Sequence, residues 1–208
     1  MKRQNEFVYN EATRIHTLGG KIIPSVSNIV SPLVDYSEVP KDRLERKRDL
    51  GIAFHDAIRL YLHDDLDEES LDEQLIIPMK QFREFWLDYE FKNLPSPAII
   101  AIEKPFCNTK LKYCGKPDLV TEDAVYDWKL RKLDPVGDPI RMAGYAGLIG
   151  DYPILSTRKI IVEFSLDGRY KVHDAEKKQA WSFFRLLLER FHKNNEWEKK
   201  IEQWRKST

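Results

Sequence analysis

The fold is decided by one short stretch of the chain, GKPDLVTEDAVYDWK, which covers residues 115–129. Its apolar runs lie on either side of a polar turn, which predicts two strands of a hairpin. If the turn is centred at positions 122–123, Asp118 and Asp127 stand opposite each other on one face of an antiparallel pair. Lys129 lies two residues beyond Asp127 and therefore faces the same side of the sheet.

These three side chains suit a divalent cation and a phosphate substrate. Two neighbouring carboxylates repel each other, and a shared cation relieves that repulsion. Mg²⁺ prefers oxygen ligands and commonly brings substrate phosphate into its coordination shell. A nearby ammonium would orient or help deprotonate an attacking water and offset charge on the phosphate. The acid-x-Lys spacing alone is weak, because it recurs in segments that we interpret as solvated helix faces: Glu45–Lys47, Glu90–Lys92, Glu176–Lys178 and Glu198–Lys200.

Length and composition narrow the class of protein. The chain has 208 residues, 34 basic and 34 acidic side chains, and 42% apolar residues, which suits one folded domain and excludes disorder. Its longest stretch without charge, 22–34, contains two prolines and is shorter than the roughly 18 residues of a membrane span. The N-terminus lacks the apolar core of a signal peptide, so we expect a cytoplasmic protein with no membrane partner.

The periodicity of apolar residues predicts an α/β fold with one central mixed β-sheet flanked by helices. The acidic run at 64–69 is interpreted as a solvated loop. The expected elements are a hairpin over 13–23, helices from Ser25 and over 41–63 and 71–91, strands over 98–106, 112–120 and 124–130, a helix over 140–149, a hairpin of 159–165 and 169–173, and a final helix from Asp174.

The central hairpin resembles a known catalytic motif. Gly115-x-x-Asp118 followed by Asp127-x-Lys129 is similar to the core of the PD-(D/E)XK nucleases, a restriction-endonuclease-like fold. More narrowly, the chain resembles the RecB-like branch and the compact phage-type exonucleases. The resemblance implies a single nuclease domain over 1–208, with an N-terminal hairpin and helices over 1–95, a catalytic core over 96–173 and a C-terminal helix over 174–208.

Upstream residues extend this resemblance in family order from about residue 13 to 149. The branch places a Gly-x-x-x-His helix before the hairpin, which Gly51 and His55 match. It also has a glutamate strand, which Glu103 matches. Phage-type members often open with a Gly turn and a Pro-Ser helix start, similar to GKIIPSVS at 20–27. No one of these elements is strong, but together they form a specific pattern.

The resemblance assigns roles to individual residues. It implies Lys129 as the catalytic lysine, and one or two Mg²⁺ or Mn²⁺ ions held by His55, Asp118, Asp127 and the backbone carbonyl of Trp128. Glu103 would act in catalysis by binding the metal through water or a second ion, or it would form a salt bridge at a strand end. For a lone histidine on a helix, the alternative is a hydrogen-bonded core imidazole. No iron–sulfur cluster is expected, because Cys107 and Cys114 are too few to ligate one.

One position departs from the family pattern. Its helix after the lysine strand usually carries Gln-x-x-x-Tyr, whereas this chain has Arg141 and Tyr145. Both would lie on one helix face, and arginine would grip a DNA phosphate in bidentate fashion. The change would alter substrate positioning or mark a weakened enzyme.

The neutral total charge hides a segregated distribution. Residues 104–116 hold four lysines and no acid, residues 158–208 hold thirteen bases against eight acids, and residues 64–73 hold seven acids and no base. A basic channel with an acidic exterior is therefore possible. We expect Lys110, Lys112 and Lys116 to contact DNA, although Lys110 and Lys112 would equally suit ordinary hairpin-tip residues.

The expected function is that of a metal-dependent deoxyribonuclease. The resemblance favours an exonuclease acting on single- or double-stranded DNA ends in phage-type recombination or processing, with a recombination or annealing protein as a further partner. The alternatives are a weak or inactive DNA-binding or assembly protein that keeps the nuclease fold, a structure-specific endonuclease, or an enzyme directed at RNA. No sequence feature assigns an oligomeric state.

Overall fold

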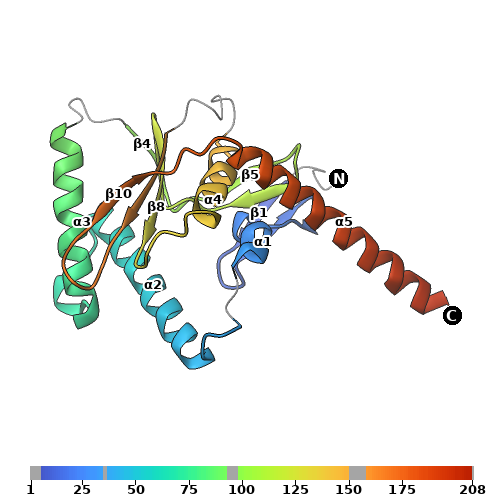
Figure 1. Cartoon of the computed structure of the whole chain (residues 1–208), viewed down its shortest axis with the longest axis horizontal. Helices are drawn as coiled ribbons and strands as arrows, with labels where there is room; N and C mark the ends of the chain where they lie inside the picture. The colour runs from blue at the N-terminus through green and yellow to red at the C-terminus, as the bar shows by residue number, and fades with distance from the viewer. Residues whose placement is uncertain (1–5, 35–36, 93–97, 150–157, 208) are drawn as a thin grey trace.

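A mixed five-stranded sheet forms the centre of the protein in a computed structural model that describes residues 6–34, 37–92, 98–149 and 158–207. The strand order is β10-β9-β8-β7-β4, in which β8 and β9 run parallel and the other neighbours antiparallel. The strands are β4 (Ile99–Ile102), β7 (Leu119–Thr121), β8 (Ala124–Lys129), β9 (Arg158–Glu163) and β10 (Lys171–Asp174). The predicted α/β class with a mixed sheet is therefore confirmed (Figure 1).

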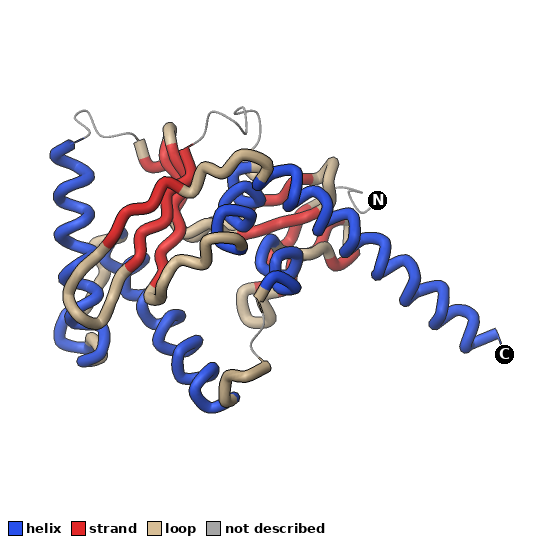
Figure 2. Tube along the Cα trace, viewed as in Figure 1, coloured by secondary structure: helices blue, strands red, loops and turns tan. Residues whose placement is uncertain are grey.

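Helices flank this sheet on both sides (Figure 2). One side carries α2 (Lys41–Leu62) and α3 (Glu73–Lys92), and the other carries α1 (Val26–Val30), α4 (Gly137–Ala146) and α5 (Ala180–Ser207). Two smaller sheets, β1-β2-β3 (Phe7–Asn10, Ile15–Leu18, Lys21–Ile22) and β5-β6 (Phe106–Asn108, Tyr113–Gly115), complete the fold with the 3₁₀ turns η1 (Ser31–Leu33) and η2 (Glu68–Ser70). No helix of the described residues combines the length and apolarity needed to cross a membrane.

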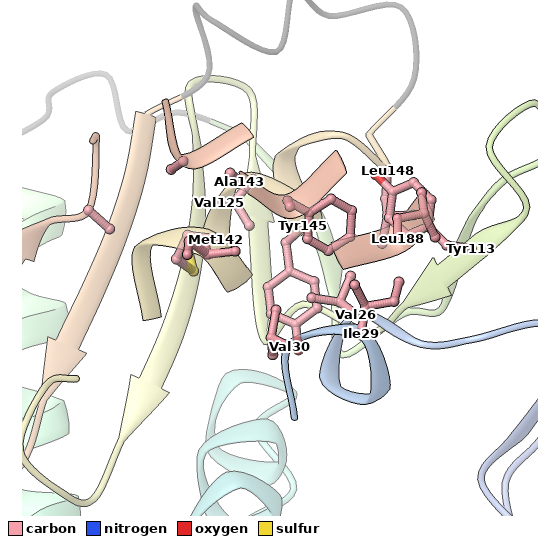
Figure 3. Close-up of a cluster of buried hydrophobic side chains, with 14 of the residues drawn as sticks. Val26, Ile29, Val30, Tyr113, Val125, Met142, Ala143, Tyr145, Leu148 and Leu188 are labelled. Carbon is pink, nitrogen blue, oxygen red and sulfur yellow. The ribbon is translucent and has the colours of Figure 1, made fainter. Parts of the chain in front are cut away.

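The two faces of β8 serve two separate cores. Tyr126 and Trp128 pack with α2 and α3, whereas Val125 packs with α1, α4 and α5. Figure 3 shows Val125 beside Met142 and Ala143 of α4 in the second cluster. Because side chains alternate along a strand, Asp127 and Lys129 share the face of Val125.

Local sequence signals account for several elements. Ser25 caps α1, since its hydroxyl oxygen accepts the backbone N–H of Asn28 at 3.2 Å. The turn between β2 and β3 uses Gly19 and Gly20, both at positive φ, as the Gly-Gly signal predicts. α2 and α3 begin within two residues of their expected starts, and Pro78 lies inside α3.

Two expected strands are each divided in two, which corrects the prediction. The segment 98–106 splits into β4 and β5, and the segment 112–120 splits into β6 and β7. Glu103 breaks the first expected strand, because its backbone has a positive φ of 45°. Pro117 interrupts the second expected strand, because proline has no N–H to donate to a neighbouring strand. The linking residues therefore lie between two sheets rather than inside one strand.

Other boundaries also differ from expectation. Strand β1 is additional, and α4 begins at Gly137 rather than at position 140. The final helix begins at Ala180, not at Asp174, because Asp174 still pairs with Ile160 as the last residue of β10. Cys107 and Cys114 face each other across β5 and β6 as free thiols.

Candidate metal centre

Three side chains from three separate elements converge beside the end of β7. His55 of α2, Glu103 after β4 and Asp118 before β7 each direct one potential ligand atom into a group whose atoms lie within 4.8 Å of one another. Nδ1 of His55 lies 3.2 Å from Oδ1 of Asp118 and 3.7 Å from Oε1 of Glu103. One imidazole and two carboxylates form a donor set that suits a divalent cation.

Asp118 is the most constrained member of this group. Its Oδ2 accepts the backbone N–H of Trp128 at 2.6 Å, and its backbone carbonyl accepts the N–H of Glu103 at 2.9 Å. β7 pairs with β8 through Leu119–Tyr126 and Val120–Val125. Continuing that register places Asp118 opposite Asp127, as the turn arithmetic predicts. Asp118 therefore connects β4, β7 and β8 at one point.

The same register explains why a backbone carbonyl is available at this site. It places Pro117 opposite Trp128, and proline has no N–H with which to bind a carbonyl across the pair. The N–H and carbonyl of one strand residue point to the same side. Since the Trp128 N–H points to Asp118, its carbonyl points toward the same edge. That orientation suits the predicted role of this carbonyl as a ligand.

Asp127 and Lys129 form a buried ion pair next to the group. Nζ of Lys129 contacts Oδ2 of Asp127, and both side chains are less than 10% exposed. Among the described residues, the carboxylates that join His55 within 4.8 Å are those of Glu103 and Asp118, so Asp127 is not in this group. Asp127 is nevertheless near enough to act electrostatically on Asp118. Its role as a ligand stays a prediction.

Glu103 lies closer to the centre than sequence reasoning suggested. Besides its contact with His55, it forms an ion pair with Lys116, whose Nζ is 2.5 Å from Oε2 of Glu103. Glu103 adopts a left-handed backbone conformation at φ 45°, which costs a residue other than glycine roughly 1–2 kcal/mol. Glu103 therefore forms a salt bridge at a strand end and also contacts His55, and its role in binding a metal stays a prediction.

The charges of this cluster shift the pKa values of its members. Burial opposes ionisation of His55, but the charge of Asp118 and hydrogen bonds to Asp118 and Glu103 outweigh it and raise the pKa of His55 to about 10. Burial likewise opposes ionisation of Glu103, whose hydrogen bonds with His55 and Lys116 lower its pKa to about 2. Burial raises the pKa of Asp118, with His55 opposing and Asp127 reinforcing the shift. A cation would relieve the repulsion between Asp118 and Asp127.

The ligand group opens into a cleft of about 510 Å³. Its lining includes cationic and aromatic side chains that the sequence motifs did not indicate, among them Tyr9 and Arg14 from the β1–β2 hairpin and Arg48 from α2. Equal numbers of Lys or Arg side chains and carboxylates line the cleft. The three basic side chains are those of Arg14, Arg48 and Lys116, and the three carboxylates are those of Asp56, Glu103 and Asp118. Hairpin residues of this kind carry no periodic signal, so only the tertiary structure could place them here.

Gly51 and Gly115, the glycines of the two sequence motifs, lack a side chain for different structural reasons. A Cβ on Gly115 would lie 2.8 Å from Cδ1 of Leu148 and 3.0 Å from Cε1 of Tyr145, so the absence of a side chain permits close packing. A Cβ on Gly51 would meet no atom within 4 Å, although Gly51 lies inside α2 and lines the cleft. Gly51 therefore keeps space open in the cleft rather than relieving a clash.

The remaining predicted DNA contacts divide between two places. Lys116 and the edge of Tyr145 line the cleft, but Tyr145 is only 7% exposed and packs in the core of Figure 3. Arg141 is half-buried one helical turn before Tyr145. Lys110 and Lys112 lie instead in a second cleft beside α5.

No family model matches the chain, and no curated protein matches it in sequence. The functional interpretation therefore depends on the residues and their geometry.

Proposed function

We propose that this protein is a divalent-metal-dependent deoxyribonuclease, with the cleft around His55, Glu103 and Asp118 as its active site. The observation that carries the proposal is the convergence of these three side chains beside a buried Lys129–Asp127 pair on β8. A carboxylate-rich metal group next to a lysine is suited to hydrolysis of a phosphodiester.

Different residues of the cleft would bind the metal and orient the attacking water. His55, Glu103, Asp118 and the Trp128 carbonyl would hold Mg²⁺ or Mn²⁺, with Asp127 as a further candidate ligand. When bound, such a cation lowers the pKa of a coordinated water and stabilises negative charge on phosphate oxygens. The Lys129 ammonium, released from Asp127, would orient the attacking water and offset the developing charge.

The cationic side chains that line the cleft would bind the substrate. Arg14 and Arg48 line the same cleft as the carboxylate group and suit bidentate binding of phosphate oxygens. Tyr9, whose ring lies 4.6 Å from that of His16 between centroids and is tilted by 31° against it, offers an aromatic surface for a base or sugar. A nucleic-acid strand supplies both kinds of group, whereas a free phosphate supplies only one.

One observation favours the second candidate function, a DNA-binding protein without strong catalysis. The carboxylates of the site are already neutralised from within the chain, since His55 pairs with Asp118, Lys116 with Glu103 and Lys129 with Asp127. A cation must displace part of this network before it binds. Weak metal affinity would leave a cleft that holds DNA but cuts it slowly.

Digestion of end-labelled linear DNA tests the proposal. We expect loss of label from single- or double-stranded ends with Mg²⁺ or Mn²⁺, none in EDTA, and a fall of at least about 100-fold for Lys129→Ala. Lys178→Ala, in the acid-x-Lys pair Glu176–Lys178 outside the site, is the matched control. Cleavage in EDTA, or equal activity of Lys129→Ala, overturns the mechanism, and DNA binding without cleavage favours the second candidate. Cutting of closed circular DNA would assign an endonuclease instead of an exonuclease.

A further inference from the structure

A second cleft, of about 630 Å³, lies between the β5–β6 turn, β3 and α5. Its lining is strongly cationic and contains one carboxylate, that of Glu189. The four Lys or Arg side chains of the lining are those of Lys21, Lys110, Lys112 and Arg185. Its lining also includes apolar side chains, among them Ile23, Leu188 and Ile22, the last of which is 74% exposed. Cations beside apolar side chains suit a ligand that carries both phosphates and apolar ring surface.

The turn that carries two of these lysines is held rigidly. Nε2 of His192 on α5 lies 3.2 Å from the carbonyl oxygen of Leu111, and the Asn108 amide donates to the Gly147 carbonyl at 3.0 Å. Asn108 also accepts the N–H of Leu111 at 2.9 Å, which closes the turn. The hairpin therefore lies beside α5 (Figure 1), and its lysines project from a fixed frame.

Lys112 occupies a backbone position that glycine would fill at lower cost. Its φ is 55°, in the left-handed region, and its N–H donates to the Asn108 carbonyl at 2.8 Å. Lysine in this conformation costs roughly 1–2 kcal/mol. The Lys112 side chain is exposed in a cationic cleft, so the strain of its backbone indicates that its charge serves to bind a ligand.

The second cleft lies at the far end of β6 from the candidate metal centre. Lys112 lines the second cleft and Lys116 lines the first, with β6 between them. Four residues of extended chain span about 13 Å. That separation equals roughly the rise of four nucleotides along one strand of a duplex.

We infer that the second cleft binds the phosphate backbone of the DNA strand that continues from the candidate metal centre. This inference rests on the proposed function, because it takes DNA as the ligand of the first cleft. The strand would place phosphates on Lys21, Lys110, Lys112 and Arg185 and its sugars or bases against the apolar side chains of the lining. Binding of DNA would therefore strengthen once the strand is long enough to reach both clefts.

Fluorescence anisotropy with single-stranded DNA in EDTA tests the inference without requiring cleavage. The variant Lys21→Ala/Lys110→Ala/Lys112→Gly removes three exposed charges, and glycine suits the left-handed position. For a strand of about 12 nucleotides, which reaches both clefts, we expect affinity to fall about tenfold and the salt slope to fall by about 2. For a strand of about three nucleotides, which is shorter than the separation of the two clefts, the loss should shrink to about twofold.

A matched variant separates this cleft from general electrostatics. Lys80→Ala/Arg169→Ala/Lys171→Ala removes the same charge from α3 and the β9–β10 hairpin, away from α5 (Figure 1). Equal losses in the two triple variants, or no dependence on strand length, overturn the inference. Tighter binding of an RNA strand of the same sequence overturns DNA as the partner. A single Lys110→Glu variant should weaken binding of the longer strand more than Lys110→Ala, and an unchanged affinity would contradict the inference.

The outcomes also separate this inference from the proposed function. Length-dependent DNA binding without cleavage in Mg²⁺ or Mn²⁺ would overturn the proposed function and support the second cleft. Metal-dependent cleavage with no length-dependent binding would support the proposed function and overturn the second cleft.

Discussion

Nδ1 of His55 lies 3.2 Å from Oδ1 of Asp118, although the two residues are 63 positions apart in the chain. α2 supplies the imidazole and the residue before β7 supplies the carboxylate, so the contact joins a helix to the start of an interior strand of the sheet. Glu103 joins the same group from the end of β4. This meeting of three elements is the structural basis for each of the functional proposals.

Metal binding should stabilise the folded protein through this group. Mn²⁺ at 100 times its dissociation constant should add about 2.7 kcal/mol to the free energy of unfolding, because the unfolded chain lacks the assembled ligands. Asp118→Asn should remove most of that gain, as seen in thermal melts with and without Mn²⁺. Asp123→Asn is the control, since Asp123 pairs with Arg158 away from the group. The same Mn²⁺ stabilisation in Asp118→Asn would refute the assignment of the ligands.

Lys129 and Asp127 should contribute to the free energy of unfolding mainly through their interaction with each other. Lys129→Met leaves the buried Asp127 carboxylate without its cation and should cost about 3–5 kcal/mol. Adding Asp127→Asn removes the stranded charge and should recover part of that loss, while activity stays absent. Urea unfolding of the single and double variants measures the coupling. Additive losses in the double variant would show that the two side chains do not interact.

Glycine should suit position 103 better than alanine does. Both Glu103→Gly and Glu103→Ala lose the contacts with His55 and Lys116, so the two variants differ mainly in backbone strain at φ 45°. Glu103→Gly should therefore unfold with a free energy about 1 kcal/mol higher than Glu103→Ala. Denaturant titration gives the difference, and a more stable alanine variant would mean that the left-handed conformation is not strained. Both variants should lose the stabilisation by Mn²⁺.

Gly51 should lower the stability of α2 while it keeps space open in the cleft. Gly51→Ala places a methyl group where no atom lies within 4 Å and should stabilise α2 by about 0.5–1 kcal/mol. Because the methyl group enters the cleft, the same change should weaken DNA binding in the anisotropy assay. Gly144→Ala is the contrast, since its Cβ would lie 2.5 Å from Cε2 of Phe184 and should cost about 1–3 kcal/mol by overpacking. A Gly51→Ala variant with higher stability and unchanged DNA affinity would remove Gly51 from the binding surface.

Stability should fall on acidification through Asp138. Burial opposes ionisation of Asp138, but hydrogen bonds from Arg131 and the charge of Lys129 hold its pKa below the ordinary value. A lowered folded-state pKa contributes stability that is complete above about pH 4 and is lost as the pH falls through the folded value. Asp138→Asn should cost about 1–3 kcal/mol at pH 7, less than a fully buried pair because Arg131 is partly exposed.

The pH dependence of that variant is the sharper measurement. The difference in unfolding free energy between wild type and Asp138→Asn should narrow as the pH drops below about 4, since the wild-type carboxylate then becomes protonated. Urea unfolding at a series of pH values gives this difference directly. A difference that stays constant from pH 7 to pH 3 would rule out the Arg131–Asp138 pair as its source.

Short-range patterns in the sequence determined the parts of the site that lie close together in the chain. The turn at 122–123 was enough to place Asp118 opposite Asp127, because register in a tight hairpin follows from counting residues. The apolar period of 41–63 predicted the helix that carries His55, and Ser25 marked the start of α1. Each of these inferences uses neighbours within one element, where backbone geometry is nearly fixed.

Contacts between distant segments were decided only by the tertiary structure. Sequence reasoning extended 98–106 and 112–120 as continuous strands, whereas both break where Glu103 and Pro117 leave one sheet for another. Those breaks bring Glu103 to His55, and the strand β6 separates Lys110 and Lys112, which line the second cleft, from Lys116, which lines the first. Periodicity along the chain cannot encode such meetings, because they depend on how whole elements pack and on which buried charges must find a partner.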